Sequence, residues 1–181
     1  KRAAAASEVA MEQGPVSSFL STGFCGGLDP ELNVSDVFVA EKVVGDGGQR
    51  WDVSEVHTGD QRAARGLLLS RDEVVITKDD KRSLFRSLGA RAVEMEAAAV
   101  AQMAHQNGVP FYCIRVVSDA ASDGLPLDFN QFRAPSGRFR RGRILGAVLA
   151  HPSSIRGLLR LNTNSLRAAR SLGDFLVHCQ F

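Results

Sequence analysis

Residues 92–122 read AVEMEAAAVAQMAHQNGVPFYCIRVVSDAAS, and this stretch indicates the fold class. An alanine-rich helix with one apolar stripe is expected over 94–107, closed by Gly108. A nearly continuous apolar strand over 110–117 follows, as expected in a sheet that is buried on both faces. A helix that leads directly into a buried strand is typical of an α/β domain.

The same two kinds of element alternate along the rest of the chain. Helices are expected over 2–13, 78–88, 143–150 and 153–177, and strands over 16–22, 36–44, 66–70 and 73–77. We therefore predict one α/β domain over 1–181, with three layers and a mostly parallel, twisted sheet flanked by helices. Ligands bind beyond the C-terminal ends of the strands in such sheets, where TGFCGG (22–27), SRDE (70–73) and SDAAS (118–122) are expected.

The composition of the 181 residues is that of a globular protein, with 44% hydrophobic and 23% charged residues. No apolar run reaches the ~20 residues that span a bilayer, and the first residues do not resemble a signal peptide. Cys25, Cys113 and Cys179 are odd in number and far apart, which indicates free thiols in a reducing, cytoplasmic compartment. The histidines show no metal-ligand spacing, and we expect neither metal nor cofactor.

The charge is unevenly distributed. Residues 133–170 carry many arginines and no acid, whereas the rest of the chain is net negative. This basic helical extension of the domain (133–181) could contact a membrane surface through 133–170, or it could be a solvated arginine face. We favour the solvated face, and we expect no nucleic-acid partner.

Three acids stand out at the ends of the quoted stretch. Glu94 and Glu96 flank Met95 at the expected start of the helix, where a carboxylate could accept hydrogen bonds from two sugar hydroxyls. Asp119 follows the buried strand, where an acid can serve as a proton donor. The alternatives are a favourable charge at a helix N-terminus for the glutamates and a turn-forming role for the aspartate.

TGFCGG is a glycine-rich turn after a strand in this interpretation. Successive N–H groups of such a turn can hold an anion or approach a ring closely. The motif is neither GxGxxG nor a P-loop, and a glycine turn is often no more than a turn.

Together these motifs resemble the purine nucleoside phosphorylase/nucleosidase superfamily. The resemblance rests on TGFCGG followed by LDPELNVSDVFVA, on GLLLSRD, and on AVEMEAAAVAQMAHQNGVPFYCIRVVSD. The branch most similar to residues 3–132 is that of the methylthioadenosine/S-adenosylhomocysteine nucleosidases. The resemblance implies a nucleoside phosphorylase-like fold, a homo-oligomer, and cleavage of the N-glycosidic bond of a purine nucleoside.

The resemblance also implies roles for individual residues. Glu96 would bind the ribose hydroxyls, beside Glu94, and Met95 would pack under the sugar. Asp119, oriented by Ser118, would protonate N7 of the leaving purine and accept a hydrogen bond from the exocyclic amine. The remaining substrate-binding positions are in two segments. Phe24 and the backbone of Cys25 and Gly26 would lie near the base and the ribose. Val74 and Val75 would offer backbone hydrogen bonds and an apolar wall to the purine.

The chain departs from the family pattern at several positions. Ser21 stands where phosphorylases carry a phosphate-binding arginine, and Phe24 stands where a serine is usual, so water is favoured over phosphate as the acceptor. Val74 replaces an aromatic residue. The family's first strand, which carries a further catalytic group, is expected to be missing before Lys1.

Three functions follow as expectations. The first is hydrolytic release of adenine from a 5′-substituted adenosine. The second is a phosphorylase or nucleosidase that acts on a lipid-linked adenosine, because the helices after Phe132 and the TGFCGGLDP turn also resemble the hopanoid-associated phosphorylases. The third is an inactive nucleoside-binding fragment.

Overall fold

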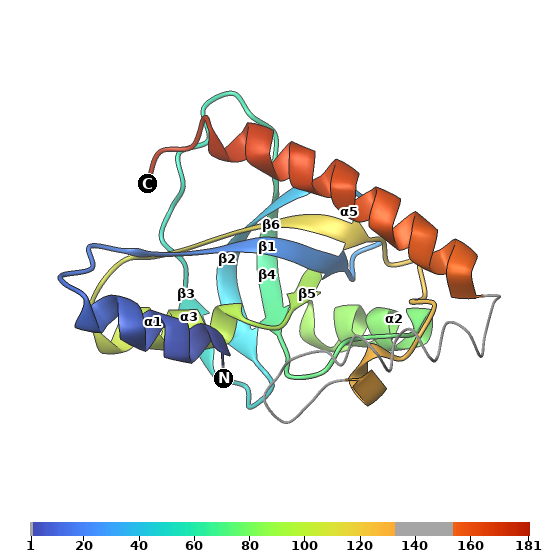
Figure 1. Cartoon of the computed structure of the whole chain (residues 1–181), viewed down its shortest axis with the longest axis horizontal. Helices are drawn as coiled ribbons and strands as arrows, with labels where there is room; N and C mark the ends of the chain where they lie inside the picture. The colour runs from blue at the N-terminus through green and yellow to red at the C-terminus, as the bar shows by residue number, and fades with distance from the viewer. Residues whose placement is uncertain (1, 133–153) are drawn as a thin grey trace.

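The computed structural model describes residues 2–132 and 154–181 (Figure 1). The predicted helix at 143–150 lies outside the described residues. The elements in chain order are α1 (Arg2–Glu12), β1 (Phe19–Gly27), β2 (Val37–Gly45), β3 (Arg50–Asp52), β4 (Ala64–Ser70), α2 (Lys78–Leu88), β5 (Ala92–Glu94), α3 (Ala97–Gln106), β6 (Phe111–Asp119), the 3₁₀ helix η1 (Phe129–Phe132) and α5 (Ser154–Leu176).

The described strands form one mixed sheet in the order β3-β2-β4-β5-β1-β6. The two longest pairings, β1 with β6 and β2 with β4, are parallel, as is β4 with β5. The pairings of β1 with β5, β2 with β3 and β2 with β6 are antiparallel. The α/β class is therefore confirmed, but the sheet is mixed, and the β2–β6 pairing closes it into a ring.

Helices cover both sides of this sheet, as predicted. One buried cluster joins α3, through Ala97, Val100, Ala101 and Ala104, to the sheet residues Phe38, Leu68 and Cys113. A second cluster joins Ala168 and Phe175 of α5 to Val37, Val39, Ile114 and Val116. Figure 1 shows α5 on one side of β6 and β1, with α1 and α3 on the other. Strand β6 is thus covered on both faces, which explains its continuous apolar sequence.

Capping residues fix both ends of α2, whose bounds match the predicted helix over 78–88. The Oγ1 atom of Thr77 accepts a hydrogen bond from the N–H of Asp80 at 3.0 Å, and so caps the N-terminus. Gly89 ends the helix with a φ of 67°, a left-handed conformation that favours glycine. The helix therefore begins directly after the segment 71–77, which reaches the site described below.

Three local predictions were wrong, and two short strands were missed. The glycine run TGFCGG is the end of strand β1, because its residues pair with β6 up to Cys25 and continue after an irregularity at Gly26. Residues 73–77 form a loop instead of a strand. The helix over 94–107 begins later, at Ala97, because Glu94 belongs to β5. The short strands β3 and β5 were not predicted.

Within residues 2–132 and 154–181, no helix is both long enough and apolar enough to cross a membrane.

Candidate active site

A pocket of about 470 Å³ opens at the C-terminal ends of β1, β5 and β6. All ten residues that the sequence singled out line it, namely Phe24, Cys25, Gly26, Val74, Val75, Glu94, Met95, Glu96, Ser118 and Asp119. The three motifs that were expected at one edge of the sheet therefore do meet there. The structure places these residues together, while their individual roles stay predictions.

Asp119 is the last residue of β6 and is 9% exposed. The hydroxyl Oγ of Ser118 lies 2.7 Å from Asp119 Oδ1 and 3.2 Å from the carbonyl oxygen of Cys25. The single hydroxyl proton favours the shorter contact, so Ser118 orients the carboxylate of Asp119. Gly26 allows β1 to approach it closely, because a Cβ there would lie 3.1 Å from Asp119 Oδ2.

The second oxygen of Asp119 binds a lysine that the sequence analysis missed. The Nζ atom of Lys81 donates to Asp119 Oδ2 at 2.5 Å and to the carbonyl oxygen of Ala120 at 2.8 Å. The side chain of Lys81 is completely buried. Lys81 precedes Leu84 and Phe85 by three and four residues, so its place on the apolar face of α2 was the available signal.

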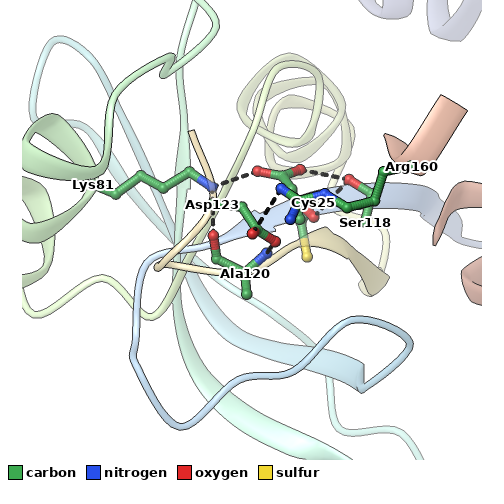
Figure 2. A network of polar contacts seen from close by, with 7 residues as sticks. Cys25, Lys81, Ser118, Ala120, Asp123 and Arg160 are labelled. Atoms are coloured by element: carbon green, nitrogen blue, oxygen red, sulfur yellow. Dashed lines mark hydrogen bonds and ion pairs between the residues drawn. The ribbon is translucent and has the colours of Figure 1, made fainter. Parts of the chain in front are cut away.

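Figure 2 shows how these contacts continue to α5. The N–H of Ala120 donates to Asp123 Oδ2 at 3.1 Å, and Asp123 Oδ1 accepts from Arg160 Nη2 at 3.0 Å. Arg160 is mostly exposed, and exposed ion pairs contribute little to stability. The pair nevertheless links α5 to the loop that directly follows Asp119.

Glu94 is buried and its oxygens are already occupied. Its Oε2 lies 2.7 Å from Nη2 of Arg115, and both side chains are 2–3% exposed. Its oxygens also accept the backbone N–H groups of Glu96 at 2.8 Å and Ala97 at 2.9 Å. Glu94 therefore holds the start of α3 in place, and its predicted contact with the substrate stays a prediction.

Arg115 lies between this glutamate and β1. Its Nη2 donates to Oγ of Ser21 at 2.6 Å, whereas its buried Nε has no hydrogen-bond partner. Burial lowers the pKa of Arg115, but the charge of Glu94 and the weaker effects of Cys113, Cys25 and Glu96 together raise it by more, so the pKa lies above its ordinary value. Arg115 therefore stays charged, and it lies in direct contact with Ser21 of β1.

Glu96 contrasts with Glu94. It is exposed, it sits at the N-cap of α3, and its side chain makes no capping hydrogen bond. None of the ion pairs or side-chain hydrogen bonds found in the described part of the chain engages its carboxylate. Both of its oxygens are therefore available to accept hydrogen bonds from a ligand in the pocket.

The loop 71–77 forms another wall of the pocket. The side chain of Asn130 binds both backbone groups of Val74, with Val74 N to Oδ1 at 2.8 Å and Nδ2 to Val74 O at 2.9 Å. Those backbone groups are consequently occupied, and Val74 offers an apolar wall instead of backbone hydrogen bonds. Leu125 completes the apolar part of this wall.

The pocket offers neither thiol nucleophiles nor a metal cluster in the described residues. Burial raises the pKa of the Cys25 thiol, which lines the pocket, well above its ordinary value, so this thiol stays protonated at neutral pH. The described ranges contain no group of three or more His, Cys, Asp or Glu side chains that could hold a metal ion. Of the four carboxylates that line the pocket, Glu96 and Asp119 are the ones best placed for chemistry, and the buried cations Arg115 and Lys81 hold Glu94 and Asp119.

Comparison with known proteins gives the chain a family. Its residues 1–57 and 52–150 match the family model described as Phosphorylase superfamily. It is 31% identical over 159 residues to a 5′-methylthioadenosine/S-adenosylhomocysteine nucleosidase of Anoxybacillus flavithermus, over 72% of this chain and 68% of that protein. A protein of the same name from Listeria welshimeri is 29% identical over 62% of this chain and 61% of its own length.

Solved structures agree on the fold. The nucleosidase of the same name from Helicobacter pylori, in complex with butyl-thio-DADMe-Immucillin-A, aligns with 97% of this chain and 72% of its own at a TM-score of 0.68 and 19% identity. An S-adenosylhomocysteine nucleosidase of Streptococcus pyogenes aligns over the same shares at a TM-score of 0.69 and 19% identity. By sequence and by fold, the chain belongs to the phosphorylase superfamily.

Proposed function

We propose that this chain cleaves the N-glycosidic bond of a purine nucleoside by hydrolysis and releases adenine from a 5′-substituted adenosine. The observation that carries the proposal is the pair of carboxylates in one pocket. Glu96 is exposed and unengaged by the described side chains, whereas Asp119 is buried and bonded to Ser118. The nucleosidases from Anoxybacillus and Listeria are named for adenosine derivatives of this kind.

The sugar would lie against Glu96 and Met95. A carboxylate with two free oxygens matches a pair of neighbouring hydroxyls, such as those of a ribose. Met95 is half-buried beside it and offers a soft apolar surface to the ring. As the bond to the base breaks, the sugar becomes positively charged, and the nearby carboxylate stabilises that charge.

The purine would lie against Asp119 and the apolar wall of Val74, Val75 and Leu125. A purine leaves poorly as an anion, so a proton delivered to N7 lowers the barrier to bond cleavage. Asp119 lies at the end of β6 with its orientation fixed by Ser118, which suits the transfer of a proton to a base held in one position. Afterwards the carboxylate can accept a hydrogen bond from the exocyclic amine.

Water is favoured over phosphate as the attacking group. Among the described residues that line the pocket, Arg115 is the one cation, and it is already bound to Glu94. Ser21 stands at the arginine position of the phosphorylases and accepts a hydrogen bond from Arg115. A dianionic phosphate would therefore meet carboxylates without a free counter-charge.

The test is adenine release from methylthioadenosine, adenosylhomocysteine and adenosine, in phosphate-free buffer and with phosphate added. Release without phosphate is expected, and Asp119→Asn should lower kcat by about 10²- to 10⁴-fold, the usual contribution of a general acid. Glu96→Gln should lower kcat/KM by about 100-fold, because charge-assisted hydrogen bonds to the sugar are lost. Release only with phosphate would identify a phosphorylase, and binding without turnover would identify a nucleoside-binding protein.

A lipid-linked adenosine is the second candidate substrate. It rests on the resemblance of the C-terminal part to hopanoid-associated phosphorylases, part of which lies at 133–153, outside the described residues. Contact of 133–170 with a membrane surface is part of the same proposal. A lipid-linked adenosine added in the same assay decides between the two substrates.

The assembly and location stay proposals as well. The family resemblance favours a homo-oligomer, and the three free cysteines favour the cytoplasm. Light scattering of the purified chain measures the first, and fractionation of cells that produce it measures the second.

A further inference from the structure

The buried Lys81–Asp119 pair raises a chemical problem for the proposed mechanism. A general acid must carry a proton that it can give away, yet Asp119 Oδ2 lies 2.5 Å from an ammonium group and Oδ1 accepts from Ser118. Both oxygens therefore accept hydrogen bonds from the protein. In this geometry neither oxygen is left to present an O–H group to a ligand.

Lys81 is the group that holds a proton there. Its side chain has no exposed surface and does not line the pocket, so it reaches the substrate only through Asp119. Of its three protons, one points to Asp119 Oδ2 and one to the carbonyl oxygen of Ala120. The ammonium group of Lys81 is therefore in direct hydrogen-bond contact with the carboxyl group that faces the pocket, which is the geometry that a proton transfer between the two requires.

We propose that Lys81 is a positioning residue that supplies Asp119 with the proton delivered to the purine. The inference rests on the proposed function. An N–H bond of Lys81 breaks as an O–H bond forms at Asp119 Oδ2, and that O–H bond breaks as the proton binds N7. Lys81 is left as a neutral amine and Asp119 as a carboxylate. Water then attacks the sugar and releases one proton, which restores the ammonium group.

A substrate whose leaving group needs no proton isolates this role. Para-nitrophenolate leaves a ribofuranoside as a stable anion, so its release depends on the sugar side of the pocket and not on an acid. Lys81→Met should lower kcat for adenine release by about 10²-fold or more, while nitrophenolate release stays within about threefold of wild type. Glu96→Gln should lower both. Lys78→Met, at an exposed position of the same helix, should change neither.

A second variant separates proton supply from charge pairing and guards against misfolding. Lys81→Arg keeps a cation beside Asp119, but a guanidinium does not give up a proton in proteins. We expect this variant to lose adenine release and to keep nitrophenolate release. Two results would overturn the proposal. The first is full adenine release by Lys81→Arg. The second is an equal loss of both activities in Lys81→Met, together with loss of both activities in Lys81→Arg. A wild-type protein that releases neither product would overturn the proposed function itself, and the inference with it.

Discussion

Glu94 and Glu96 lie two residues apart and experience opposite environments. Glu94 ends β5, where its oxygens bind Arg115 and the N–H groups of Glu96 and Ala97, whereas Glu96 is the N-cap of α3 and lines the pocket. The sequence analysis assigned both glutamates to the site and to one helix. The periodicity of the apolar residues could not show that a strand ends at Glu94, before the helix begins. One of the two supports the fold, and the other is open to a ligand.

Replacing the buried glutamate tests this division of roles. Glu94→Gln would leave the buried guanidinium of Arg115 without its counter-charge, which costs about 3–5 kcal/mol of unfolding free energy. Urea denaturation followed by circular dichroism measures the loss. Glu73→Gln, at an exposed pocket position, is the matched control and should change stability by less than about 0.5 kcal/mol. A small effect of Glu94→Gln would show that Arg115 finds another partner or water.

At the scale of elements, helix α2 was predicted correctly and the short strands were not. The predicted bounds of α2, 78–88, match the observed ones, although its N-cap Thr77 was assigned to a strand over 73–77. The strands β3 and β5 have three residues each, too few for an alternating pattern to appear. The glycines of β1 suggested a turn, yet the strand continues through them because β6 supplies a parallel partner.

The site, too, could be predicted only where the sequence carries a local signal. Most of the ten predicted lining residues lie at or near a strand end, and the resemblance supplied Val74 and Val75, which lie in loop 71–77. Lys81, Arg115 and Asn130 were missed because their contacts join segments that are distant in sequence: Lys81 is 38 residues from Asp119, and Asn130 is 56 residues from Val74. Contacts of this kind follow from the tertiary fold, and the one local signal among the three residues was the position of Lys81 on the apolar face of α2.

Asn130 provides a prediction at this scale. Its side chain connects η1 to loop 71–77, the wall against which the purine base would lie, through hydrogen bonds to the two backbone groups of Val74. Asn130→Ala should therefore loosen the wall and raise KM for the nucleoside by about tenfold, with a stability loss of about 1–2 kcal/mol for the lost hydrogen bonds. Steady-state kinetics and urea denaturation measure the two effects. Gln131→Ala, at the exposed neighbouring position, should leave KM unchanged, and an unchanged KM in Asn130→Ala would show that the wall keeps its shape without this tie.

At the scale of the whole molecule, β6 joins the two sides of the protein to the site. Its side chains alternate between the clusters, with Cys113 and Val117 facing the α3 side and Ile114 and Val116 facing the α5 side. The same strand ends at Asp119. A mutation that destabilises the packing of α3 or of α5 on β6 should consequently also disturb the pocket, because β6 carries Asp119.

Phe175 tests that coupling. It is 5% exposed and anchors the C-terminal part of α5 to Val37, Val39, Ile114 and Val116. Phe175→Ala should cost about 3–5 kcal/mol, because a large buried side chain is replaced by a cavity. Since α5 covers one face of β6, we expect the whole chain to unfold in one transition at lower urea, with helix content and a pocket-bound adenine analogue lost together. Leu166→Ala, on the same helix and 59% exposed, should cost less than about 1 kcal/mol. Separate transitions, in which α5 unfolds while the pocket still binds the analogue, would mean that β6 keeps the site intact without its α5 layer.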